Sequence, residues 1–260
     1  MYKRQELLQY QHGALRVQFH AEEGKLYQRL GEVRALLPET MDISDIAEAN
    51  INHFIQERLE ELSLREMALL TGPLWSLQYV THSQSQSQSQ SQNKYVLICI
   101  HHIITDAWSV KLIVNQVIEN YHRLQQFQQV PHKPVALSCL DYSHWQATQV
   151  SNIQQQLEFW QQTLSDRPDY QLIPQDFESK QARADVVDVA LPQDTVNVLR
   201  ALAAEQKVTL FTVLLAVFKL AVFVQTEQKE LLVGTDITNR DQVPGLEKVV
   251  GMFMNQLVVR

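Results

Sequence analysis

The side chains with the clearest capacity for chemistry are two adjacent histidines and an aspartate four residues after the second: His101, His102 and Asp106. Imidazole titrates near neutral pH, so a histidine can accept or donate a proton during a reaction. Imidazole and carboxylate groups also bind zinc. Aspartate can instead cap a helix, because its carboxylate accepts the free N–H groups of the first turn. These residue types are therefore consistent with three alternatives: a catalytic group, a metal site or a capped helix.

The flanking sequence predicts how these side chains are held. The apolar run 95–100 is long enough for a buried strand, and apolar residues recur at helical spacing over 110–124. The polar cluster therefore lies where a strand passes into an amphipathic helix, at the rim of the core. Neighbouring strand residues point to opposite faces, so we expect His101 and His102 to have different surroundings. This divergence argues against a shared metal ion.

Composition narrows the class of protein. The chain has 260 residues, 45% of them hydrophobic, which suits one large domain or two lobes. Its net charge of -7 argues against a nucleic-acid partner. The longest apolar run, 210–224, is shorter than the roughly 20 residues that cross a bilayer, and no secretory signal peptide is visible. Cys99 and Cys139 lie beside apolar residues, which argues against a disulfide framework. The sequence predicts a cytoplasmic protein without a membrane partner.

Alternation and helical spacing predict mixed strands and helices, and therefore an α/β or α+β fold in two lobes. The expected helices are 3–10, 46–62, 110–124, 153–164, 194–205 and 210–224, and the expected strands are 15–19, 74–80, 94–100, 186–191 and 230–235. The Ser-Gln repeat 83–92 is predicted to form a flexible hairpin tip. A break in the pattern from Arg167 onward separates the predicted lobes, 1–165 and 166–260.

Five segments, in order along the chain, resemble motifs of the condensation domains of nonribosomal peptide synthetases. They are 11–16, with His-x-x-Leu-Arg; 101–109, with His-His-x-x-x-Asp; 141–146, with Asp-Tyr-x-x-Trp-Gln; 234–240; and 250–255. Ala107 stands where the family usually has glycine, and alanine suits a helix start. A Ser-x-x-Gln segment that should precede the first match is absent, as is the later part of the second lobe. We therefore expect that lobe to be incomplete.

The resemblance implies two lobes similar to chloramphenicol acetyltransferase, and amide-bond formation between an aminoacyl amine and an acyl or peptidyl thioester. Donor and acceptor peptidyl carrier proteins would bring both substrates on phosphopantetheine arms, alongside the adjacent synthetase domains. The thioester is already activated, so neither a metal nor a bound cofactor is expected. Two alternatives stay open: a catalytically inactive fragment that docks carrier proteins, and a stand-alone acyltransferase that uses coenzyme A thioesters.

By motif position, the resemblance implies that His102 is the catalytic residue, either as a general base or by orienting the amine and stabilising charge. His101 is expected to hold the loop. Asp106 is predicted to pair with Arg16 and lock that loop, since a buried arginine–carboxylate pair is commonly bidentate. Asn255 is a candidate channel residue. Three aromatic residues are expected to pack in the core: Trp108, Tyr142 and Trp145.

Overall fold

A computed structural model of the chain describes residues 3–35, 38–83, 92–127, 136–149, 153–167 and 187–260. Two compact units result: residues 1–154 with 238–255, and residues 155–237 with 256–260. This division differs from the predicted boundary after residue 165, because the late segment 238–255 packs with the first part of the chain. The boundary between the lobes themselves stays a prediction.

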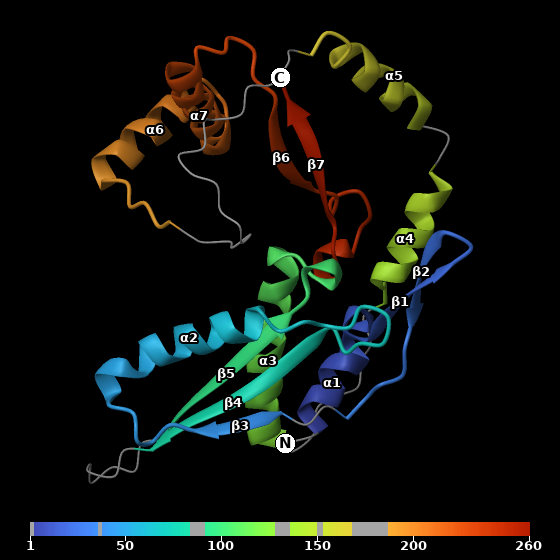
Figure 1. Cartoon of the computed structure of the whole chain (residues 1–260), viewed down its shortest axis with the longest axis vertical. Coiled ribbons are helices and arrows are strands. Elements are labelled where there is room, and N and C mark those ends of the chain that lie inside the picture. Colours follow the sequence, from blue (N-terminus) through green and yellow to red (C-terminus); the bar gives the residue numbers. More distant parts are fainter. Residues whose placement is uncertain (1–2, 36–37, 84–91, 128–135, 150–152, 168–186) are drawn as a thin grey trace. The chain divides into compact units, whose positions relative to one another are not determined.

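A three-stranded sheet forms the centre of the first unit (Figure 1). Its strands lie in the order β3 (Glu39–Asp42), β4 (Trp75–Ser83) and β5 (Gln92–Ile100). β3 runs parallel to β4, whereas β4 and β5 are antiparallel neighbours. The hairpin predicted for these last two strands is confirmed. Its predicted tip, the Ser-Gln repeat, lies almost entirely outside the described residues.

Apolar side chains of β5 reach both faces of this sheet. On one face Leu97 packs in the core that includes residues of α2 (Ile51–Ser63). On the other face Ile98 packs against the core formed with α3 (Ala107–Phe127) and α1 (Lys3–Gln11). Burial on both faces explains why this strand reads as a continuous apolar run rather than as an alternating pattern.

A second hairpin, β1 (Val17–Glu22) with β2 (Lys25–Leu30), belongs to the same unit. Its two-residue turn places Glu23 and Gly24 at positive φ, the geometry that matches the twist of hairpin strands. The 3-10 turn η1 (Gly13–Arg16) joins α1 to β1. The strand therefore begins two residues later than predicted.

Local sequence determines where α4 (Cys139–Thr148) begins. The Ser138 hydroxyl accepts a hydrogen bond from the Asp141 N–H at 3.2 Å, and the Asp141 carboxylate accepts one from the Ser138 N–H at 2.8 Å. This reciprocal arrangement is a capping box. Helix α2 begins later than predicted, because the 3-10 turn η2 (Glu48–Asn50) precedes it.

The remaining helices and strands come from the later part of the chain. They are α5 (Ile153–Thr163), α6 (Gln193–Glu205), α7 (Leu210–Thr226), β6 (Val233–Thr238) and β7 (Met254–Val259), the last two paired as a small sheet. The strand predicted at 186–191 is wrong. Residues 187–191 are exposed and pair with no strand of the described chain, so their apolar alternation is not matched by a sheet.

A helix that crosses a bilayer must be both long and apolar. Within the described ranges no single helix meets both requirements. Only α6 and α7 taken together do so, as a pair bent by 110°.

Candidate active site

The histidine pair lies in a 3-10 turn, η3 (His102–Ile104), that links the end of β5 to the start of α3. His101 caps this turn, because its Nδ1 accepts a hydrogen bond from the Ile103 N–H at 3.1 Å. The His101 carbonyl accepts a second one from the Ile104 N–H at 3.1 Å. These contacts agree with the loop-holding role expected for His101.

Burial changes abruptly along the turn. His101 is half-buried, His102 and Ile103 are exposed, and the residues from Ile104 to Asp106 are buried. The two histidines thus have the different surroundings that the sequence predicts. Among the described residues, the His102 side chain has no hydrogen-bond partner, so its imidazole is free to contact a substrate.

Asp106 is the buried end of the motif, 2% exposed, and its main partner is Arg240. Arg240 Nη2 donates to both carboxylate oxygens, at 2.9 and 3.0 Å. The carboxylate also accepts the N–H of Ser109 at 2.7 Å, which caps α3, and the N–H of Phe253 at 3.2 Å. The predicted pairing of Asp106 with Arg16 is therefore wrong.

Arg16 lies instead in the turn that leads into β1. Its Nη1 donates to the carbonyl of Gly31 at 3.1 Å, and its own carbonyl accepts the Gly31 N–H at 2.9 Å. The β1–β2 hairpin brings the Gly31 backbone beside Arg16, so this guanidinium is bound locally. A long-range partner for Asp106 must come from elsewhere in the chain.

Arg240 is the long-range partner of Asp106, and other contacts hold its guanidinium in place. Its Nη1 donates to the carbonyls of Leu246 at 2.8 Å and Val249 at 2.6 Å, and its guanidinium stacks over the Phe253 ring at 4.5 Å. Arg240 is the last residue of the family-like segment 234–240, so the sequence contained it without indicating its partner.

The balance of forces on Asp106 keeps it ionised. Burial by itself raises the pKa of this carboxyl, but the hydrogen bonds from Ser109 and the charge and hydrogen bonds of Arg240 outweigh it. The net pKa of Asp106 lies below its ordinary value. The carboxylate therefore serves as a charged anchor at neutral pH rather than as a proton donor.

The first turn of α3 makes further contacts with the same late segment. Trp108 Nε1 donates to the carbonyl of Glu247, in the turn η5 (Leu246–Lys248), at 2.8 Å. The Ser109 hydroxyl bonds both backbone groups of Gly251. The expectation that Trp108 packs in the core is wrong, because Trp108 is about half exposed and is absent from the buried core clusters of the described residues.

The expectation that Tyr142 and Trp145 pack in the core is confirmed. Tyr142 is buried and meets the Phe253 ring edge-on, with ring centroids 5.1 Å apart. Trp145 is half-buried and lies next to Tyr142 at a centroid distance of 5.6 Å. Both residues thus join the small core around Phe253.

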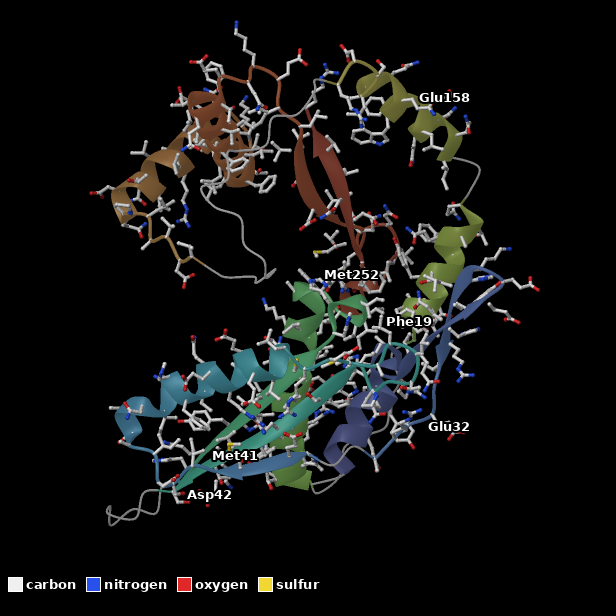
Figure 2. The ribbon with its side chains drawn as sticks, in the orientation of Figure 1. Phe19, Glu32, Met41, Asp42, Glu158 and Met252 are labelled. Carbon is white, nitrogen blue, oxygen red and sulfur yellow. The ribbon has the colours of Figure 1, made fainter. Side chains whose placement is uncertain are left out.

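A cavity of about 240 Å³ lies beside the histidine turn, within the first unit. Residues from four of the family-like segments, from β1 and β2 and from the start of α4 line it: Ala14, Val17, Phe19, Gln28, Ile103, Ile104, Cys139, Tyr142, Ser143, Gln146, Gly251, Met252 and Phe253. Figure 2 labels two of these residues, Phe19 and Met252. With Arg240 stacked on Phe253, all five segments come together around one site. Residues up to 239 positions apart thus meet at the histidine turn.

Two observations bear on cofactor chemistry. Within the described part of the chain, no three His, Cys, Asp or Glu side chains cluster closely enough to hold a metal ion. Burial raises the pKa of the Cys139 thiol to about 11, so this cavity-lining cysteine is protonated at neutral pH and is a poor nucleophile. Asn255, the candidate channel residue, is exposed on β7.

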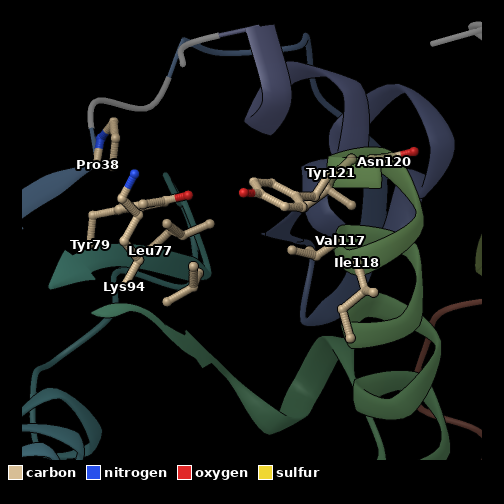
Figure 3. A pocket seen from close by; sticks show the side chains of 10 residues that line it. Pro38, Leu77, Tyr79, Lys94, Val117, Ile118, Asn120 and Tyr121 are labelled. Atoms are coloured by element: carbon tan, nitrogen blue, oxygen red, sulfur yellow. The ribbon is translucent and has the colours of Figure 1, made fainter. Parts of the chain in front are cut away.

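A larger cavity, of about 340 Å³, lies away from this site between the sheet and α3 (Figure 3). Figure 3 shows Tyr79 and Tyr121 extending from opposite walls, with Lys94 nearby. Most of the lining is apolar, and none of the motif residues reaches it. Its volume alone does not make it the reactive site, because the histidine turn lies elsewhere.

Comparison with known proteins identifies the family. The model of the family described as Condensation domain matches residues 4–260. This chain belongs to that family, as its five segments predict. Cyclosporin synthetase simA from Tolypocladium inflatum is 28% identical over 263 residues, which is 97% of this chain and 2% of that protein.

Solved structures show the same fold. The first condensation domain of the calcium-dependent antibiotic synthetase, in complex with a substrate analogue, matches with a TM-score of 0.77 and 18% identity, over 100% of this chain and 60% of that one. The X-domain in its complex with OxyB from teicoplanin biosynthesis matches with a TM-score of 0.80 and 17% identity, over 100% and 56%. The predicted fold class is confirmed, whereas the expected incompleteness of the second lobe stays a prediction. This chain spans about three fifths of these structures.

Proposed function

We propose that this chain carries out the condensation step of nonribosomal peptide synthesis. An amine carried by an acceptor carrier protein attacks the thioester carbonyl of a donor acyl or peptidyl group. The nitrogen–carbon bond forms, the carbon–sulfur bond breaks, and the donor thiol leaves with the proton that the amine gives up. The observation that carries this proposal is that four of the five family-like segments line one cavity next to the turn of the exposed His102, while the fifth reaches it through Arg240, which stacks on Phe253.

His102 is the catalytic residue of this proposal. Its exposed imidazole can take the proton from the attacking amine, which is worth roughly 10²–10⁴-fold in rate. It can equally orient the amine or stabilise the charge of the tetrahedral intermediate. Asp106 and Arg240 hold the turn that presents it.

The remaining requirements follow from the substrates. Both are carried on the phosphopantetheine arms of partner carrier proteins, within a synthetase whose adjacent domains load them. The thioester is already activated, so the chain needs neither a metal nor a bound cofactor. We place this chemistry in the cytoplasm, and Asn255 on the path of the substrates.

A reconstituted reaction tests the proposal. The chain is mixed with an acyl-loaded donor carrier protein and an aminoacyl-loaded acceptor carrier protein, and the condensed product on the acceptor is measured by mass spectrometry. We expect His102→Ala to lower the rate by about 10²-fold or more. His53→Ala is the matched control, because His53 is an exposed histidine on α2, outside the five segments.

One observation favours a second candidate, a non-catalytic docking role. The X-domain to which this chain is similar was solved in a complex with another protein, OxyB. Under this alternative the chain would bind carrier proteins without forming product, and His102→Ala would leave binding unchanged. Product formed by the unaltered chain excludes this alternative. Turnover only with coenzyme A thioesters and a free acceptor would indicate a stand-alone acyltransferase.

A further inference from the structure

Ser109 lies in the first turn of α3 and is 0% exposed. Its hydroxyl donates to the Gly251 carbonyl at 2.8 Å and accepts the Gly251 N–H at 3.0 Å. It also accepts a hydrogen bond from Arg240 Nη2 at 2.7 Å. A hydroxyl has one donor and two acceptor positions, so this side chain uses its whole capacity on one late segment of the chain.

The Gly251 backbone, which the Ser109 hydroxyl hydrogen-bonds, is tightly packed. A Cβ added at Gly251 would lie 2.7 Å from Cε2 of Phe253 and 2.9 Å from Cβ of Cys139. Gly251 therefore has no room to shift toward these neighbours. Its N–H and carbonyl have few other partners in the described chain, since Arg240 Nη2 reaches the carbonyl only at 3.5 Å.

The same segment forms a wall of the site. Gly251, Met252 and Phe253 line the 240 Å³ cavity together with Ile103 and Ile104 of the histidine turn. Ser109 is not itself a lining residue, but it connects two segments that are: its helix follows the histidine turn, and its hydroxyl bonds the backbone of Gly251. A displacement of about 1 Å in a reacting geometry can lower a rate by about 10²-fold.

We propose that Ser109 is a positioning residue that holds the Gly251–Phe253 wall in register with His102. The proposal rests on the condensation activity proposed above. Ser109 does not touch the substrate; it acts through the backbone of Gly251. Loss of its hydroxyl leaves the Gly251 N–H without its partner and lets the wall move relative to the histidine turn.

Two measurements on Ser109→Ala test this, well below its melting temperature so that the variant is fully folded. Hydrogen exchange by NMR reports on the Gly251 amide, whose protection should fall by about tenfold when one buried hydrogen bond is lost. In the carrier-protein reaction, kcat/KM should fall by about tenfold or more. Ser109→Thr keeps the hydroxyl and should restore both. Ser63→Ala, which removes an exposed hydroxyl from the end of α2, is the control.

A second variant alters the Gly251–Phe253 wall directly instead of through Ser109. Gly251→Ala forces the same segment to move, so its effect on kcat/KM should be smaller in the Ser109→Ala background than alone. If the effects of Ser109→Ala and Gly251→Ala on kcat/KM were strictly additive in free energy, the proposed coupling between Ser109 and the wall would be overturned. This test does not require Ser109→Thr to fold.

The outcomes separate the two proposals. If the unaltered chain forms no product, the condensation function fails. If it is active and a folded Ser109→Ala keeps full kcat/KM, the positioning role fails while the function stands. A lowered melting temperature with unchanged kcat/KM would mark Ser109 as a purely structural residue.

Discussion

Two 3-10 turns of the first unit, η1 and η3, are built alike and differ in burial. Each links a helix to a strand, each is preceded by a histidine, and each leads to a charged residue of a family-like segment. The histidine before η1, His12, is 6% exposed, and the charged residue of that turn is Arg16. In η3 the turn itself carries His102 at the surface, while Asp106 is buried.

The difference between the two histidines is one of burial and not of residue type. Both ring nitrogens of His12 are buried without a hydrogen-bond partner among the described residues. This burial lowers the pKa of His12 to about 4, so its ring is neutral and enclosed at neutral pH. The exposed His102 can meet a substrate.

The charged residues differ in the same way. Arg16 donates to one nearby carbonyl, and its Nε is buried without a partner in the described chain. Asp106 accepts four hydrogen bonds, two of them from Arg240, which lies 134 residues away in sequence. One turn is held by its own hairpin, and the other is held by a distant part of the chain.

The largest expected effect on stability comes from removing the buried ion pair between Asp106 and Arg240, which holds the end of η3. Asp106→Ala leaves Arg240 buried without its carboxylate, so we expect the free energy of unfolding to fall by about 3–5 kcal/mol in a denaturant titration. Asp45→Ala, at an exposed position, should change it by less than about 0.5 kcal/mol. A normally stable, fully active Asp106→Ala variant would contradict the anchoring role.

A smaller effect, dependent on pH, is expected from His12, the residue that precedes η1. Its pKa of about 4 in the folded chain lies below the ordinary 6.5, so between these values the unfolded chain binds more protons. Stability should therefore decrease as pH falls from 6.5 toward 4, by up to about 3 kcal/mol. Denaturant titrations at pH 7, 5.5 and 4.5 compare the unaltered chain with His12→Leu, which lacks this titration. Equal pH dependence in both would show that His12 is not held neutral.

The smallest expected effect concerns Arg16. Its removal costs one hydrogen bond to a backbone carbonyl, so Arg16→Ala should lower the free energy of unfolding by about 1–2 kcal/mol. A double-mutant cycle with Asp106→Ala should show a coupling below about 0.5 kcal/mol, because the two side chains do not meet. A coupling well above 1 kcal/mol would restore the pairing that the family motifs suggest.

Much of the local structure could be predicted from periodicity. The continuous apolar run before His101 is a strand, and the apolar spacing after Trp108 is a helix, because each pattern matches the faces that these elements bury. The strand expected at 186–191 failed for the converse reason. Val187 and Val189 alternate as in a strand, yet no partner of the described chain pairs with them, and alternation alone supplies no hydrogen bonds.

The sequence by itself determined the family and the motif segments, and it offered the cap of α3 by Asp106 as one of three alternatives, because spacing and local hydrogen bonding are properties of neighbouring residues. Only the tertiary structure decided which arginine meets Asp106, that His12 is enclosed while His102 is exposed, and that Ser109 holds Gly251. These outcomes depend on the direction in which side chains leave folded elements. Residues 16 and 240 carry the same charge, and only the packing of the segment 238–255 beside α3 distinguishes them.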